Sequence, residues 1–241
     1  MRKKILTAGP LVAEVIYTPK NVHRDDRQRA AKTMASTEAQ RCYNHKRSWQ
    51  KLELYLAANL GKGDIVGCLT FNDEQLPATR KQVARRVGVF RDKLRKVRAA
   101  RGQELVMFWS IEHRHGEGRW HIHFACNATG RCDYKEIFSL WGRGGVELHP
   151  LRVDKDKNYG SLAQYMSKEA RDKVGQQAWS CTKNINKYDE DSLDVPDNSH
   201  LQIPDNAIVF ADRHDRNEFG RYEYVKYVRT NAARTVKRRK E

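Results

Sequence analysis

The feature of this sequence most able to do chemistry is a pair of histidines separated by one apolar residue. His121 and His123 lie between Trp120 and Phe124, with Ile122 between them. Since side chains alternate along a strand, the two imidazoles point to one face while the three large apolar side chains fill the other. Two imidazoles on one face form half of a metal site. Taken alone, the same pattern is more often a pair of exposed or singly hydrogen-bonded histidines.

A carboxylate nine residues before His121 supplies a third candidate ligand. Glu112 ends the preceding strand, and a carboxylate with two imidazoles suits a catalytic divalent ion, which needs open coordination positions. A symmetric loop that pairs Glu112 with Trp120 would place the carboxylate on the wrong face, so a one-residue offset or a bulge is required. His113 and His115 are spare candidates, more typical of loop residues that contact DNA.

A tyrosine and a lysine one helical turn apart form the second candidate constellation. The segment 159–173 predicts a helix on which Ser161, Tyr165 and Lys168 lie on one side. A phenol titrates near pH 10 when unperturbed, so Tyr165 needs a metal ion or another cation nearby to attack at neutral pH. Without the histidines, the pattern would indicate an ordinary surface tyrosine. Tyr159, six residues earlier, points about 120° away on such a helix.

The elements that must position these residues predict an α+β fold, in which helices cover an antiparallel sheet. Strands are expected over 12–17, 64–71, 105–111, 120–125 and 146–153, followed by a hairpin of 207–212 and 219–228. Helices are expected over 37–60, 79–102, 133–141 and 159–173. The first opens at a capping box that begins with Thr37. The second is covered by basic side chains except for a buried stripe of Val83, Val87, Phe90, Leu94 and Val97.

The net charge favours a polyanion as the partner. The 241 residues include 46 Lys and Arg against 30 Asp and Glu, a formal net charge of +16. The excess lies in 1–51, 79–102 and 226–241, at +8, +9 and +6, while the remainder of the chain is −7. One such run is as often a solvated face, but three favour nucleic acid, because each cation placed on a phosphate releases a counterion. An anionic membrane surface is the weaker alternative.

Cysteine usage and the apolar pattern predict a cytoplasmic protein. Five cysteines without a C-x-x-C pair indicate reduced thiols. No apolar run reaches the roughly 18 residues that a membrane span requires, so no membrane partner is expected. The basic start at Met1 is not followed by the apolar run of a signal peptide.

Together, these residues resemble the HUH endonucleases, which are named for a histidine–hydrophobic–histidine pair. Glu112, the pair at 121–123 and the Tyr165-x-x-Lys168 motif carry the resemblance, and Cys68-Leu-Thr-Phe71 occupies the place of the family's first strand motif. Because the tyrosine follows the histidines and the third ligand is a glutamate, the order is similar to that of rolling-circle replication initiators of bacterial plasmids and phages. Relaxases of the same superfamily place the tyrosine near the N-terminus. The resemblance covers about residues 36–187.

The resemblance implies a ferredoxin- or RRM-like fold and a nicking reaction in a bacterial host cell. His121, His123 and Glu112 would hold Mg²⁺ or Mn²⁺ against a phosphate of single-stranded or hairpin origin DNA. Tyr165 would attack that phosphate, forming a 5′-phosphotyrosine bond and freeing a 3′-OH for a polymerase, while Lys168 adds electrostatic stabilisation. The sequence contains no P-loop motif, so unwinding requires a separate helicase or negative supercoiling.

Three parts are expected along the chain: a basic extension over 1–36, an endonuclease domain over 37–187, and a segment over 188–241 with an acidic linker, a hairpin and a basic tail. The expected DNA contacts are Arg85, Arg86, Arg95, Arg98, His113 and Lys183. Two alternatives stay open at this point. One is a single-tyrosine transposase of the same superfamily. The other is a non-catalytic module that stacks bases on Trp109, Trp120 or Tyr165.

Overall fold

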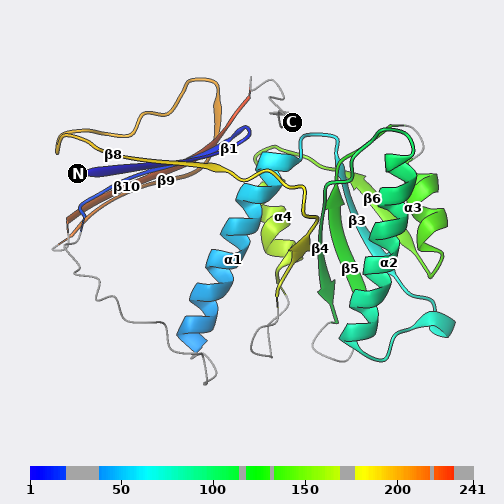
Figure 1. Cartoon of the computed structure of the whole chain (residues 1–241). Helices are drawn as coiled ribbons and strands as arrows, with labels where there is room; N and C mark the ends of the chain where they lie inside the picture. Colours follow the sequence, from blue (N-terminus) through cyan, green and yellow to red (C-terminus); the bar gives the residue numbers. More distant parts are fainter. Residues whose placement is uncertain (20–37, 114–117, 131–132, 169–176, 218–219, 231–241) are drawn as a thin grey trace. The chain divides into compact units, whose positions relative to one another are not determined.

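The computed structural model of the chain describes residues 1–19, 38–113, 118–130, 133–168, 177–217 and 220–230 (Figure 1). The chain divides into two compact units. The terminal unit comprises Met1–Lys46, Asp154–Asp156 and Lys187–Glu241, and the central unit comprises Arg47–Val153 and Lys157–Asn186. Both sheets are antiparallel and helices accompany them, so the predicted α+β class is confirmed. No helix within the described ranges is both long and apolar enough to cross a membrane.

A five-stranded sheet in the order β6-β3-β5-β4-β7 forms the centre of the central unit. Its strands are β3 (Ile65–Thr70), β4 (Met107–Glu112), β5 (His121–Cys126), β6 (Val146–Pro150) and β7 (Ser180–Cys181). The four strands expected between residues 64 and 153 are all present, with slightly different ends. The histidine pair lies on β5, which is the middle strand of this sheet, as the family resemblance implied.

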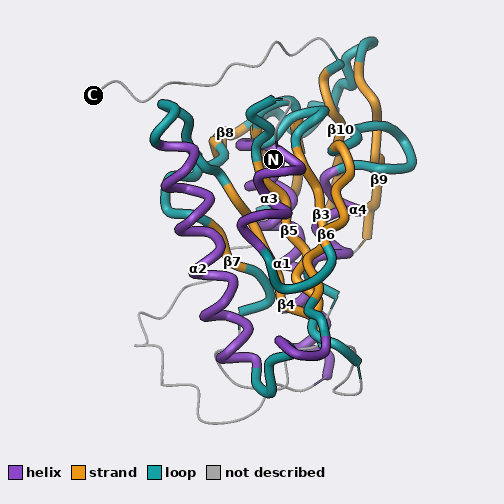
Figure 2. The backbone as a smooth tube through the Cα atoms, turned by 90° about the vertical axis from the view of Figure 1, so that its right-hand side faces the viewer, coloured by secondary structure: helices purple, strands orange, loops and turns teal. Residues whose placement is uncertain are grey.

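Four α-helices and one 3₁₀ turn complete the set: α1 (Glu38–Asn59), η1 (Asp73–Gln75), α2 (Arg80–Ala99), α3 (Asp133–Trp141) and α4 (Tyr159–Met166). Thr79 caps α2, and Gln82 returns the hydrogen bond to complete a capping box. The capping box expected at Thr37 lies outside the described residues, as do residues 169–173 of the last expected helix. Figure 1 shows α2 and α3 on one side of the central sheet, and in Figure 2 the same two helices face the viewer.

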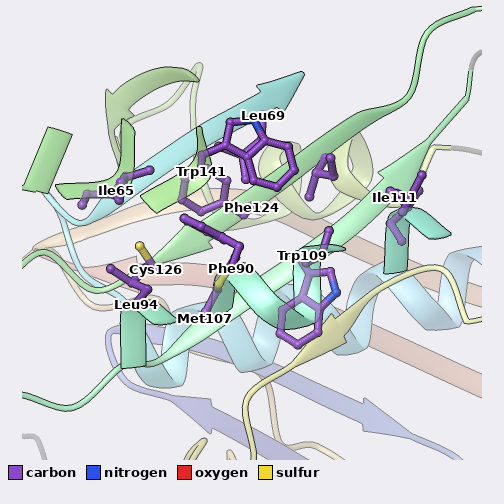
Figure 3. Close-up of a cluster of buried hydrophobic side chains, with 14 of the residues drawn as sticks. Ile65, Leu69, Phe90, Leu94, Met107, Trp109, Ile111, Phe124, Cys126 and Trp141 are labelled. Atoms are coloured by element: carbon purple, nitrogen blue, oxygen red, sulfur yellow. The ribbon is translucent and has the colours of Figure 1, made fainter. Parts of the chain in front are cut away.

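The main core lies between the central sheet and the pair α2–α3 (Figure 3). Ile122 and Phe124 of β5 are fully buried there, which leaves His121 and His123 on the opposite face of the strand. Phe90 packs edge-on against Trp141 of α3, with ring centroids 5.7 Å apart. Because this apolar layer fixes the register of β5, it also fixes the direction of the histidines.

The buried stripe of α2 ends in an arginine where the sequence pattern predicts a valine. Val97 is 37 % exposed, whereas Arg98 is completely buried; both follow Leu94 within about one helical turn, so spacing alone does not separate them. The Arg98 guanidinium donates to the Asn127 carbonyl at 2.9 Å and to Asp133 Oδ1 at 3.1 Å. The prediction that Arg98 contacts DNA is therefore wrong, because α3 provides a buried anion that holds this side chain inside.

Replacing Arg98 with methionine should destabilise the central unit by about 3–5 kcal/mol, because it leaves the partly buried carboxylate of Asp133 without its cation. Arg95→Met is the matched control, since Arg95 is exposed and pairs with Asp92 at the surface; its effect should stay within about 0.5 kcal/mol. Urea denaturation followed by fluorescence measures both variants. Equal midpoints for the two variants would contradict the assignment of Arg98 to the core.

The terminal unit is a second antiparallel sheet, in the order β8-β1-β2-β10-β9. Its strands are β1 (Arg2–Ala8), β2 (Leu11–Tyr17), β8 (Asp189–Asp194), β9 (Ala207–Asn217) and β10 (Gly220–Arg229). The expected hairpin is present with a longer first strand, and Phe219 lies outside the described residues. The acidic segment expected to be a linker is strand β8, which pairs with the basic strand β1, and Lys4 binds Glu190 at 2.7 Å. Charge complementarity across the two strands compensates for the poor strand propensity of aspartate.

A buried carboxylate makes the terminal unit sensitive to acid. Burial opposes the ionisation of Glu223, but hydrogen bonds from Arg221, the Leu201 amide and His200 outweigh it and lower its pKa to about 2. Because the pKa is lower in the folded state, this stabilisation is present above the ordinary value near 4.5 and is lost as the pH falls towards 2. We expect Glu223→Gln to flatten the acid part of the stability profile measured by circular dichroism; an unchanged acid slope would contradict this role.

Candidate active site

Strand register places Glu112 on the same face as the histidines. Glu112 pairs directly with His121, and Ser110 pairs with His123. The one-residue offset that the sequence required is therefore present, because the connection between β4 and β5 begins after Glu112 and ends at Trp120. Side chains at directly paired positions lie on the same face of a sheet. The carboxylate consequently joins the imidazoles, as predicted.

Two further polar side chains occupy this face. Cys68 of β3 pairs with His123, and Glu147 of β6 pairs with Cys68. A row across the sheet therefore runs Glu147, Cys68, His123 and Ser110. The sequence alone suggested no chemical role for Cys68 or Ser110, although alternation along β4 would have put Ser110 on the face of Glu112. Recognising Cys68 required the pairing of β3 with β5, which sequence spacing does not reveal.

A chain of charged contacts connects His123, Glu112 and Lys168. His123 Nε2 lies 2.5 Å from Glu112 Oε2, and Lys168 Nζ lies 3.2 Å from Glu112 Oε1. Burial opposes ionisation of Glu112, but the hydrogen bonds from His123 and Lys168 outweigh it and lower the pKa of the carboxyl. Burial also lowers the pKa of His123, against the opposing effect of Glu112. At neutral pH the site therefore holds a carboxylate and a neutral imidazole, the forms that ligate metal ions.

The tyrosine of α4 lies directly beside this chain of contacts. The rings of Tyr165 and His123 meet edge to face, with centroids 4.6 Å apart, and Tyr165 is 47 % exposed. Lys168 Nζ lies 4.3 Å from the centroid of the Tyr165 ring. A cation at this distance favours the phenolate over the phenol. The exposed ring is accessible to a substrate, while its inner edge contacts the histidine.

Lys168 reaches the site from beyond the end of the helix. The predicted helix continued through it, but α4 ends at Met166, and the Ser167 hydroxyl donates to the Ala163 carbonyl at 2.7 Å. This local hydrogen bond competes with helix continuation. The structure thus brings Tyr165 and Lys168 together as predicted, through a different backbone path.

The second tyrosine of α4 is part of the packing. Tyr159 is 1 % exposed, and its hydroxyl donates to the Leu60 carbonyl at 2.9 Å. This agrees with the predicted divergence of the two tyrosines around the helix. Asn158 caps α4 and orients both side chains through a capping box with Ser161. Of the two phenols on α4, only that of Tyr165 lies exposed beside the histidines.

The donor set fits a divalent ion. Two ligands of one ion lie about 3 Å apart, so Glu112 Oε2 and His123 Nε2 need to separate by only a few tenths of an ångström. The buried hydroxyl of Ser110, opposite His123, has no hydrogen-bond partner among the described residues. Such an orphaned group beside a ligand set is suited to a bound water or an ion-bound oxygen. Cys68, His121 and His123 also offer ligand atoms that all lie within 4.8 Å of one another.

The predicted DNA contacts fall into two groups. Arg85, Arg95 and Lys183 are exposed and available to a nucleic acid. Arg86 instead donates to the Gln75 carbonyl and lies over the Phe71 ring, and Arg98 is buried. His113 stacks on Trp120, with ring centroids 3.8 Å apart. Since α2 packs on the core face, its exposed arginines are not on the face that carries Tyr165 and the histidines.

The aromatic groups of the base-stacking alternative are mostly unavailable. Trp109 is 9 % exposed and Trp120 is 8 % exposed, and both belong to the core under α2. Trp120 also donates to the Pro77 carbonyl at 2.8 Å. Of the three residues considered for stacking, Tyr165 alone is exposed. The geometry therefore favours a chemical role for this face over a broad stacking platform.

Comparison with known proteins agrees with the replication side of the family resemblance. No curated protein and no solved structure matches the chain at a significant level. A family model does match residues 64–170, from the start of β3 to just beyond Lys168, and therefore includes every residue of the site described above. The family that this region matches is that of the replication-associated protein ORF2, which supports a role for the chain in DNA replication.

Proposed function

We propose that this protein is a metal-dependent, site-specific nickase and strand transferase that initiates rolling-circle replication. The single observation that carries the proposal is the position of Tyr165, an exposed phenol whose ring lies 4.6 Å from that of His123 and 4.3 Å from the Lys168 ammonium. The match of residues 64–170 to a replication-associated family supports the biological context. The three cationic runs of the sequence support a polyanionic substrate.

In the proposed reaction, Tyr165 Oη attacks a phosphorus atom of single-stranded DNA. A bond forms between the phenolic oxygen and phosphorus, and the bond from phosphorus to the 3′ oxygen breaks, which leaves a 5′-phosphotyrosine and a free 3′-OH. The phenolic proton passes to solvent and the 3′ oxygen takes one from solvent, so the reaction is neutral overall. Lys168 stabilises the phenolate before attack. Attack by a 3′-OH on the phosphotyrosine reverses the step and joins strands.

His121, His123 and Glu112 are the residues that would hold Mg²⁺ or Mn²⁺. Such an ion, when bound, withdraws charge from a non-bridging phosphate oxygen. Glu112 keeps His123 oriented, burial keeps its imidazole neutral, and Lys168 keeps Glu112 ionised. The buried wall formed by Phe108 and Ala125 at the other end of this face keeps these groups in a fixed geometry.

The test is the formation of a covalent adduct. The full chain is incubated with Mn²⁺ and a labelled pool of single-stranded hairpin oligonucleotides with randomised loops, and the products are separated under denaturing conditions. We expect a labelled band at the mass of the protein plus a DNA fragment, from which the nicked sequence can be read. DNA binding without any adduct would contradict the proposal and indicate the non-catalytic module instead.

A further inference from the structure

The cysteine of β3 lies among the histidines of the site. Cys68, His121 and His123 form the one group of three potential ligands that the described residues bring within 4.8 Å of one another. Cys68 and His123 are paired across β3 and β5, so their side chains share the face that carries the site. Cys68 has a weak contact from its sulfur to the Leu69 carbonyl at 4.0 Å. Its position is thus compatible with coordination of the same ion as the histidines.

A thiol changes which ions the site prefers. Thiolate and imidazole ligands favour Zn²⁺ and Co²⁺, whereas Mg²⁺ prefers oxygen ligands and retains much of its water. A cysteine with two histidines is a ligand set found at zinc sites. Both oxygens of Glu112, by contrast, are already engaged by His123 and Lys168. A thiophilic ion therefore finds three convergent donors on this face even when Glu112 keeps its present contacts.

We propose that Cys68 is a ligand for thiophilic divalent ions, and that Zn²⁺ consequently binds this site more tightly than Mg²⁺ and inhibits it. The Cys68 thiol gives its proton to solvent as the bond from sulfur to the ion forms. When Glu112 also binds, the four protein ligands close the coordination sphere and leave no open position for phosphate. The part of this inference that concerns inhibition rests on the proposed nicking function; the part that concerns the ligand does not.

The ligand assignment can be tested without DNA. Co²⁺ is titrated into the full-length protein, and the near-ultraviolet band that arises from sulfur-to-cobalt charge transfer is recorded. We expect one equivalent of Co²⁺ to produce this band in the wild type, and Cys68→Ser to remove it. Cys181→Ser is the matched control, because Cys181 is half-buried on the same sheet, at β7, and pairs with Phe108 rather than with a site residue; its band should be unchanged. A wild-type band that survives Cys68→Ser, or a Co²⁺ complex without any such band, would overturn the assignment.

Competition measures the preference between ions. Zn²⁺ affinity, determined with a chromophoric chelator, should fall by at least about 100-fold in Cys68→Ser, since even loss of a residue behind the ligands costs roughly 10–100-fold. The affinity for Mn²⁺ should fall much less, so the ratio of the two affinities is the diagnostic quantity. Equal losses for both ions would contradict a sulfur-specific effect.

Inhibition is then tested on the adduct assay with Mn²⁺ present. Trace Zn²⁺ should block adduct formation by the wild type at concentrations about 100-fold below those needed for Cys68→Ser. If the wild type shows the cobalt band but forms no adduct under any condition, the proposed nicking function fails while the ligand assignment stands. If the adduct forms and Zn²⁺ inhibits both proteins equally, the inference about Cys68 fails and the nicking function stands.

Discussion

Replacing Tyr165 with phenylalanine is expected to abolish the covalent protein–DNA adduct. The substitution removes the one oxygen that would form the bond to phosphorus and leaves the ring that contacts His123. Because no other step can replace a missing nucleophile, adduct formation and nicking should fall by at least about 10³-fold. Gel electrophoresis under denaturing conditions and mass spectrometry of the trapped peptide provide the measurement. The peptide that contains residue 165 should carry the nucleotide in the wild type.

Tyr159→Phe is the matched control for this experiment. Tyr159 lies on the same helix but is buried, and its hydroxyl contacts the Leu60 carbonyl. The variant should lose about 1 kcal/mol of stability through that hydrogen bond and retain adduct formation. If Tyr159→Phe abolished the adduct in a folded protein while Tyr165→Phe did not, the assignment of the nucleophile would be wrong. Loss in both variants, with both folded, would indicate a role of α4 that does not depend on Tyr165 as nucleophile.

Replacing His123 with alanine should remove the dependence of nicking on a divalent ion together with nearly all the activity. His123 is 4 % exposed and contacts both Glu112 and the Tyr165 ring, so its loss removes a proposed ligand and an orienting contact at once. We expect a loss of at least about 100-fold, which added Mn²⁺ does not restore. Chelation should produce a similar loss in the wild type, and Mn²⁺ should reverse it.

His149→Ala is the control for the histidine experiment. His149 lies on β6 of the same sheet, but it is exposed, pairs in register with Val66 and contacts Glu147. Its replacement should leave both nicking and the Mn²⁺ requirement unchanged. Calorimetric titration of Mn²⁺ separates the two roles of His123, because a merely structural effect would lower activity without weakening ion binding. Wild-type ion affinity in His123→Ala would therefore contradict its assignment as a ligand.

Periodicity predicted the elements of the central unit well. The strands from 64 to 153 and the helix α2 were recognisable because one face of each is apolar, and that pattern reports burial directly. The fold class follows from the order of these elements. The strand β8 was not recognisable, since its acidic residues have little strand propensity and form a strand only by pairing with basic β1. The depth of Arg98 was also hidden, because a buried arginine is stable only when a distant carboxylate such as Asp133 meets it.

The sequence by itself determined which chemical groups this protein can use: the histidine pair on one face of a strand, a carboxylate that must share that face, and a tyrosine on a helix with a lysine close behind. Strand alternation and helical spacing are local properties, so they can be deduced from neighbouring residues. Only the tertiary structure decided that Glu112 pairs with His121, that Lys168 reaches Glu112 from beyond the end of α4, and that Cys68 lies among the histidines. These relations depend on which strands pair and in what register, which is set by burial of the common core rather than by any local pattern.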